Sequence, residues 1–188
     1  MQLTILNTER LQLRKLTPEV YDYIYKTLSE EEQLHFLGIS TLKELKKEQE
    51  KHKNGLATYN RSFIYFQVFD KEAHKLIGWC GYHTWYTDHD RAEIGYGLIN
   101  DSYKNKGLMT EALLPIINYG FQTMNLFRIE AFIGLDNIPS HKLLTKFGFI
   151  QEGLLRNHYL KDGVYEDSAI FSILKPDYLA SNINKSSI

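Results

Sequence analysis

The chain has 188 residues, 43% hydrophobic and 24% charged, a composition typical of one globular domain with a sizeable core. Its net charge of -1 excludes a general electrostatic attraction to nucleic acid or to an anionic membrane surface. The single cysteine, Cys80, excludes an intramolecular disulfide, and its apolar neighbours favour a buried thiol over a catalytic one. Neither a signal peptide nor an apolar run of roughly 20 residues is present, so we expect a cytoplasmic protein.

Hydrophobic periodicity in the first half of the chain predicts strands and helices in alternation. Leucines alternate with polar residues over residues 11–16, which predicts a strand, and Thr17-Pro18 then favours the start of a helix reaching residue 28. The charged residues 42–52 predict a solvated helix, for which RNA contact is a less favoured interpretation. Residues 63–69, 76–86 and 92–99 predict an antiparallel meander, because they are rich in aromatic and β-branched side chains.

The second half continues the alternation. Residues 110–124 have helical spacing, and Pro115 within them favours a kink or a shifted start. Strands are predicted at residues 128–133, 149–160 and 164–174, and a short helix at 139–147. We therefore expect one α/β domain with a mixed sheet, residues 1–176, followed by a polar tail, residues 177–188.

The segment YKNKGLMTE, residues 103–111, connects a predicted strand to a predicted helix. A turn that enters a helix presents unpaired N–H groups, and the helix dipole adds partial positive charge. Gly107 allows close approach of the main chain to a ligand, and Lys104 and Lys106 add charge. These features favour a phosphate site, with a lysine-containing surface loop as the alternative.

Four segments, in order, resemble the GNAT superfamily of N-acetyltransferases. Residues 92–113 (AEIGYGLINDSYKNKGLMTEAL) resemble its coenzyme A motif, and residues 136–156 (DNIPSHKLLTKFGFIQEGLLR) resemble its second motif. TERLQLRKL near the start and GVYEDSAIFSIL near the end resemble strands of the branch that acetylates the N-termini of ribosomal proteins. The resemblance implies an N-acetyltransferase domain with a mixed, mostly antiparallel twisted sheet of about seven strands flanked by about four helices.

The resemblance also implies acetyl-CoA as co-substrate. The residues that it assigns to acetyl-CoA binding are Leu98, Ile99, Lys104, Asn105, Lys106, Gly107, Leu108, Met109, Thr110, Asn137 and Lys142. Lys104 and Met109 depart from the family pattern, which usually has Gln or Arg and then Gly or Ala there. A β-bulge at Gly95 and Gly97 would open the cleft, and the N–H of Leu98 or Ile99 would polarise the thioester. For Asn137 a turn-forming role is the alternative, and for Lys142 an exposed helix lysine is the default interpretation.

Acetyl transfer to an amine requires a neutral amine and a stabilised leaving thiolate. Glu93 is the candidate base, with a strand-edge ion pair as the alternative role and His83 as a second candidate. Ser140 is the candidate donor to the thiolate, with a helix N-cap as the alternative. Leu144 occupies the position where many relatives have a tyrosine. The histidines have no metal-ligand spacing, so we expect no metal.

The sequence alone leaves the identity of the acceptor open. The resemblance favours the N-terminal α-amine of a ribosomal protein, and a small amine such as a polyamine, an amino sugar or an antibiotic is the alternative. A silent acyl-CoA-binding module is a third possibility. Residues 28–40 and 82–90 are expected to form acceptor loops, and the chain is expected to be a monomer or homodimer without direct contact to nucleic acid or membrane.

Overall fold

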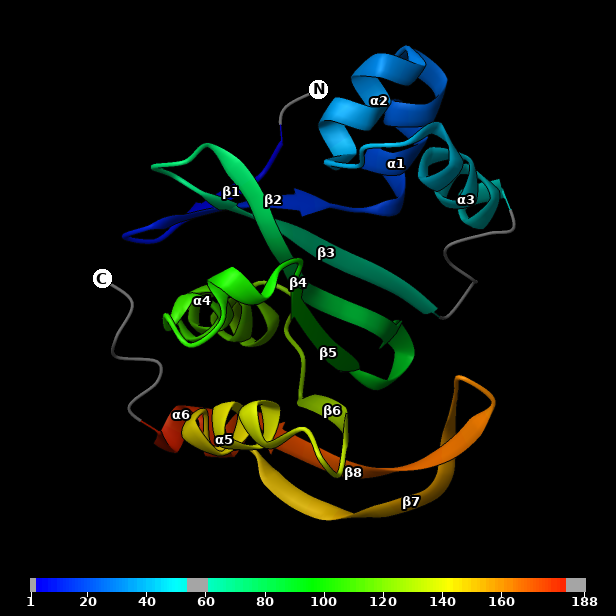
Figure 1. Cartoon of the computed structure of the whole chain (residues 1–188). Helices are drawn as coiled ribbons and strands as arrows, with labels where there is room; N and C mark the ends of the chain where they lie inside the picture. Colours follow the sequence, from blue (N-terminus) through cyan, green and yellow to red (C-terminus); the bar gives the residue numbers. More distant parts are fainter. Residues whose placement is uncertain (1–2, 54–60, 182–188) are drawn as a thin grey trace.

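The computed structural model describes residues 3–53 and 61–181, which form one eight-stranded sheet and six α-helices (Figure 1). The strands are β1 (Ile5–Asn7), β2 (Leu11–Leu16), β3 (Arg61–Asp70), β4 (Lys75–Tyr86), β5 (Arg91–Leu98), β6 (Arg128–Gly134), β7 (Ile150–Lys161) and β8 (Val164–Leu174). The helices are α1 (Pro18–Thr27), α2 (Glu30–Leu37), α3 (Leu42–Lys53), α4 (Leu108–Gln122), α5 (Ile138–Lys146) and α6 (Lys175–Ala180). The strand order is β1-β2-β3-β4-β5-β6-β8-β7, and only β5 and β6 pair in parallel. The expected α/β class is confirmed, with one more strand and two more helices than the resemblance implied.

Helix α2 occupies part of residues 28–40, so the expectation that this segment is a loop is wrong, whereas its contact with an acceptor stays a prediction. Ser29 and Glu32 form a capping box at its start, and Gly38 ends it in the left-handed conformation with φ 68°. The side chain of Gln67 on β3 donates to the carbonyl of Leu37 at 3.1 Å. This bond satisfies a carbonyl at the end of α2 and holds the helix against the sheet.

The two faces of the sheet are covered by different helices (Figure 1). Alternate residues of β4 and β5, such as Cys80 and Ile94, lie in the main core with α4 and α5. The thiol of Cys80 is fully buried, as expected. Helices α1, α2 and α3 pack around a second cluster that includes Leu16, Ile24 and Leu45. Tyr65 of β3 belongs to that cluster, so its face of the sheet is the one opposite α4.

Strands β5 and β6 separate soon after they meet. Their parallel pairing covers only three register pairs, of which the last joins Glu93 to Glu130. Beyond Glu93, β5 continues to pair with β4 on its other side. The edge of β5 from Ile94 to Leu98 is therefore left open toward β6.

The bulge expected in β5 is absent from its pairing with β4, so that prediction is wrong. The register of β5 against β4 is continuous through Gly95 and Gly97, and the irregularity lies in β4 between His83 and Tyr86. The two glycines have a different role, because the Trp79 side chain packs against both. A Cβ on Gly95 would lie 2.8 Å from the His83 ring, and one on Gly97 would lie 3.2 Å from Trp79.

The C-terminal elements pack closely against the body. Strands β7 and β8 turn at Asp162 and Gly163, which both have positive φ, as the sequence predicts. Helix α6 carries packed structure past residue 176, because Tyr178 is buried and stacks on Phe121 at 4.5 Å between ring centroids. Helical structure therefore extends to Ala180, into the segment expected to be a polar tail, and residues 182–188 lie outside the described part of the chain.

Candidate active site

A cavity of about 490 Å³ lies where the end of β5 meets the starts of α4 and α5, and we call it the α4 cavity. It is lined by Tyr96, Gly97, Leu98, Tyr103, Lys104, Asn105, Gly107, Leu108, Met109, Thr110, Asn137, Pro139, Ser140 and Leu143. Most of the residues assigned to acetyl-CoA thus surround one space. Lys106 and Lys142 are exposed and are not among its lining residues.

The turn before α4 has the geometry of an anion site. Gly107 is the N-cap of α4 with φ 73°, and Asn105 also has a positive φ of 60°. The first N–H groups of α4 have no acceptor within the helix, and the positive end of the helix dipole lies among them. Lys104 lines the cavity and pairs with Asp101 at 2.6 Å. This arrangement suits the oxygens of a pyrophosphate.

The β1–β2 connection holds this turn in place. Glu111 of α4 accepts from the main-chain N–H of Arg10 at 2.7 Å and from the Thr8 hydroxyl at 2.5 Å. The Arg10 guanidinium also donates to Glu111 at 2.6 Å and to the carbonyl of Lys106 at 3.1 Å. The sequence did not predict these contacts, because Arg10 and Glu111 lie about a hundred positions apart.

The start of α5 adds Asn137 and Ser140 to the same cavity. Asn137 is the N-cap of α5, and its side-chain oxygen accepts from the N–H of Ser140 at 3.2 Å. The N-cap alternative for Ser140 is therefore wrong, and its hydroxyl is not needed for capping.

Tyr96 of β5 also lines the cavity; the sequence pointed to its main chain as a cofactor contact but gave no role to its side chain. Its hydroxyl is buried and has no hydrogen-bond partner within the described residues. Burial raises the pKa of Tyr96, and the neighbouring Ser140 side chain acts in the opposite direction. The only sequence signal for a hydroxyl group close to Ser140 is that Tyr96 lies between two glycines, Gly95 and Gly97, in a predicted strand.

The main chain of β5 offers one of the two expected N–H groups to the cavity. The N–H of Ile99 donates to the carbonyl of Ile77 at 3.0 Å, so its expected contact with a thioester is wrong. Because alternate residues of an antiparallel strand face its partner, the N–H of Leu98 points away from β4, toward the open edge.

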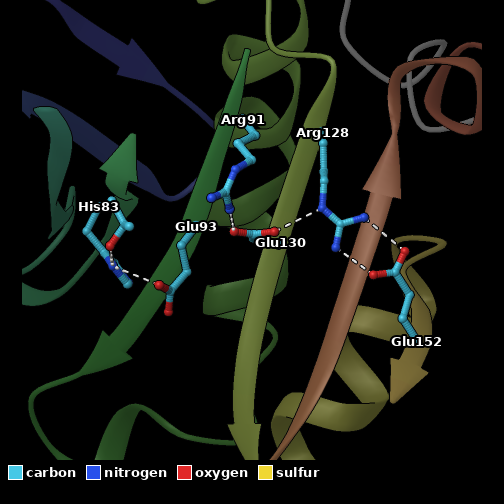
Figure 2. Close-up of polar contacts among 7 residues, drawn as sticks. His83, Arg91, Glu93, Arg128, Glu130 and Glu152 are labelled. Carbon is cyan, nitrogen blue, oxygen red and sulfur yellow. Dashed lines mark hydrogen bonds and ion pairs between the residues drawn. The ribbon is translucent and has the colours of Figure 1, made fainter. Parts of the chain in front are cut away.

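Glu93 is buried. It lies on β5 at the last register pair with β6, and its side chain points toward His83 (Figure 2). Its carboxylate lies 3.4 Å from Nδ1 of His83 on β4. Burial, and then the negative charge of Glu130, raise the pKa of Glu93 to about 7, against the Thr84 side chain. Burial lowers the pKa of His83. A carboxyl group with a pKa of about 7 is suited to general-base catalysis near neutral pH.

A second cavity, of about 340 Å³, lies between α1, α3, β3 and β4, and we call it the α3 cavity. Its lining residues are Tyr21, Glu48, Lys51, Ser62, Phe63, Tyr65, His83 and Thr84. His83 and Thr84 join it to Glu93. Burial, and then the charges of Glu93 and Glu48, raise the pKa of Tyr65.

Residues 3–53 and 61–181 contain no candidate metal-ligand cluster and no helix that could span a membrane. No group of three His, Cys, Asp or Glu side chains there could hold a metal ion. No helix in the same part of the chain is long and apolar enough to span a membrane.

Comparison with known proteins agrees with this geometry. An uncharacterized N-acetyltransferase of Bacillus subtilis (strain 168), YoaA, is 32% identical over 173 residues, covering 92% of this chain and 97% of the relative. Spermidine N(1)-acetyltransferase of Escherichia coli (strain K12) is 31% identical over 94 residues, which are 50% of each chain. The crystal structure of ribosomal-protein-S5-alanine acetyltransferase from Vibrio fischeri has a TM-score of 0.65 and 25% identity, covering 93% of this chain and 98% of that one. Residues 10–150 match the acetyltransferase (GNAT) domain family, and the chain belongs to that family.

Proposed function

We propose that this acetyltransferase moves the acetyl group of acetyl-CoA to a primary amine by direct attack in a ternary complex. The observation that carries the proposal is the position of Glu93. It lies on β5, whose residues from Tyr96 to Leu98 line the α4 cavity, and it contacts His83 of the α3 cavity. The α4 cavity would hold the donor and the α3 cavity the acceptor. The reaction would take place in the cytoplasm.

The residues have the following proposed roles. Glu93 takes a proton from the amine as its nitrogen attacks the thioester carbon, and the C–S bond then breaks. The N–H of Leu98 polarises the thioester oxygen. Ser140 donates a hydrogen bond to the thiolate, which solvent then protonates. The products are the acetylated amine and free coenzyme A.

The favoured acceptor is the N-terminal α-amine of a protein, in first place a ribosomal protein. An α-amine has a pKa of about 8, so part of it is already neutral near pH 7. A base with a pKa of about 7, such as Glu93, is therefore strong enough to take its proton. A lysine amine, with a pKa of about 10.4, would demand more of the same base. The similarity to the ribosomal-protein-S5-alanine acetyltransferase supports this choice.

A small cationic amine, such as a polyamine, is the second candidate acceptor. The lining of the α3 cavity favours it, because Tyr21 and Phe63 have ring centroids 5.8 Å apart and Glu48 adds a carboxylate. Aromatic faces and a carboxylate together attract an ammonium group. Lys51 pairs with Glu48 at 2.5 Å and would have to be displaced.

Two measurements test the proposal. Acetyl-CoA should raise the melting temperature of the protein, and the absence of any shift would contradict the donor assignment. Thiol release should then be measured with N-terminal alanine and serine peptides, internal lysine peptides, and spermidine. Turnover of the terminal peptides alone would support the protein acceptor, and turnover of spermidine alone would overturn it in favour of the second candidate.

A further inference from the structure

Glu130 is a buried carboxylate that the proposed chemistry does not use. It is the register partner of Glu93 on the parallel pair β5–β6, at the last pair before the two strands separate. Directly paired residues of neighbouring strands point to the same face of a sheet. Figure 2 shows the two glutamates side by side, with Glu93 turned toward His83 and Glu130 turned away from it.

Two arginines hold Glu130 from either side (Figure 2). Arg91 of β5 donates to one carboxylate oxygen at 2.5 Å, and Arg128 of β6 donates to the other at 2.9 Å. Arg128 is fixed in turn by two hydrogen bonds to Glu152, at 2.9 and 2.5 Å, and Glu152 accepts from Ser172 at 2.6 Å. The two guanidinium groups thus satisfy both oxygens of the buried Glu130 carboxylate.

The direction of the Arg91 side chain is the informative detail. Arg91 and Glu93 lie two residues apart on β5 and therefore on the same face of the sheet. The guanidinium nevertheless pairs with Glu130 and leaves the Glu93 carboxylate to His83 and Thr84. A carboxylate paired with a guanidinium is a weak base, because the ion pair stabilises its charged form.

We propose that Glu130 is a positioning residue for the general base: it engages Arg91 and Arg128, and so keeps Glu93 free of an arginine ion pair and ready to take the proton of the acceptor amine. This inference rests on the proposed base role of Glu93. It assigns to the arginine–glutamate network beside the site a function in setting the strength of the base.

Among the titratable groups around the Glu93 carboxyl, Glu130 and the arginines that bind it are the main charged ones. The titratable side chains that face it are His83 of β4, Tyr65 of β3, Tyr159 of β7, Glu130 of β6 and Arg91 of β5 itself. Burial lowers the pKa of His83 and raises those of both tyrosines, so these three groups are neutral at pH 7. Glu130 accordingly contributes to the raised pKa of Glu93, after burial.

A pair of variants separates the charge of Glu130 from its shape. Glu130→Gln keeps the shape and loses the charge, whereas Glu130→Asp keeps the charge and shortens the side chain. The carboxyl of Glu93 should be titrated by ¹³C NMR of glutamate-labelled protein, with Glu93→Gln to assign its resonance. We expect the midpoint to fall by about one pH unit in Glu130→Gln and to stay within about 0.3 units in Glu130→Asp. An unchanged midpoint in Glu130→Gln, or an equal shift in both variants, would overturn the inference.

Two further variants serve as a control and as a substitute test. Ser172→Ala removes a hydrogen bond from the network without changing its charge, so it should lower the melting temperature and leave the midpoint unchanged. If Glu130→Gln does not fold, Arg91→Gln decides, because the Arg91 side chain is 36% exposed and should tolerate replacement. Its midpoint should rise, and a constant or lower midpoint would overturn the inference.

The NMR titration does not depend on turnover. The base role of Glu93 and the positioning role of Glu130 can therefore be refuted separately. Full activity in Glu93→Gln would refute the proposed base, whatever the midpoint. An inactive Glu93→Gln together with an unmoved midpoint in Glu130→Gln would refute only the role of Glu130. The acid limb of kcat/KM should move with the midpoint, by about one unit, while the KM for acetyl-CoA stays constant.

Discussion

The α4 cavity and the α3 cavity are built in different ways. The α4 cavity depends on main-chain groups at one strand-to-helix turn, where the conformation of Gly107 and the start of α4 matter more than side chains. The α3 cavity, with Glu93 beside it, depends on side chains from four separate elements. Backbone recognition suits a donor with a constant phosphate group, and side-chain recognition suits an acceptor that differs between relatives.

The largest expected effect is the loss of the proposed base, Glu93, which contacts His83 of the α3 cavity. Glu93→Gln should lower kcat/KM by about a hundredfold to a thousandfold, since general-base catalysis contributes on that order. Binding of acetyl-CoA should not change, which calorimetry can check. Glu166→Gln, at an exposed ion pair with Lys161, is the control and should keep full activity.

The pH dependence of the reaction also separates catalysis by Glu93 from acetyl-CoA binding in the α4 cavity. Protonated Glu93 cannot accept a proton, so kcat/KM should fall by about tenfold per pH unit below the pKa of about 7. The affinity for acetyl-CoA, measured over the same range, should not follow this limb. A parallel loss of acetyl-CoA binding would mean that the two regions are not independent.

A backbone change should affect the α4 cavity alone. Gly107→Ala places a side chain at φ 73° without crowding, because the nearest atom to the new Cβ, on Arg10, is 3.7 Å away. The strain should raise the KM for acetyl-CoA by about tenfold and leave the KM for the acceptor unchanged. Gly163→Ala is the matched control, with φ 82° in the β7–β8 turn, and it should cost stability only.

Smaller effects are expected at the leaving thiolate. Ser140→Ala should lower kcat by about fivefold with little change in either KM, since it removes one hydrogen bond to the developing charge. Tyr96→Phe tests whether the buried hydroxyl beside Ser140 assists it, and a similar loss is expected. If both single variants and the double variant keep full kcat when chemistry is rate-limiting, neither hydroxyl has a role.

The smallest expected effect is one on stability. Burial raises the pKa of Glu93 above its unfolded value, so its contribution to stability is complete below about 4.5 and is lost as pH rises through about 7. Glu93→Gln should therefore raise the melting temperature by a few degrees at pH 8 and by less at pH 5. A lower melting temperature at pH 8 would mean that Glu93 is a structural partner rather than a strained base.

Sequence predicted the donor side better than the acceptor side, for a physical reason. The segment from Lys104 to Thr110 is continuous, so its chemistry can be read without knowing the fold. Tyr21, Glu48 and Phe63 meet only because α1, α3 and β3 fold together, and no local period signals that. The pairing of Glu93 with Glu130 likewise depends on the register of two strands far apart in the chain.

The errors have local explanations. Helix α2 was missed although Ser29 and Glu32 form a recognisable capping box, because its apolar residues show no strong period. The bulge was placed at Gly95 and Gly97 because strand glycines often mark bulges, whereas here they make room for Trp79 and His83. The N–H of Ile99 was assigned without knowing which residues of β5 face β4.

The short pairing of β5 with β6 has a consequence for the lifetime of the protein in the cell. The open edge from Ile94 to Leu98 would gain hydrogen-bond partners when acetyl-CoA lies along it. Every increase in free acetyl-CoA above its dissociation constant would then add to the free energy of unfolding, as RT ln(1 + [L]/Kd). Partial unfolding and proteolysis would be fastest when acetyl-CoA is scarce, so the amount of enzyme would follow the supply of its own substrate.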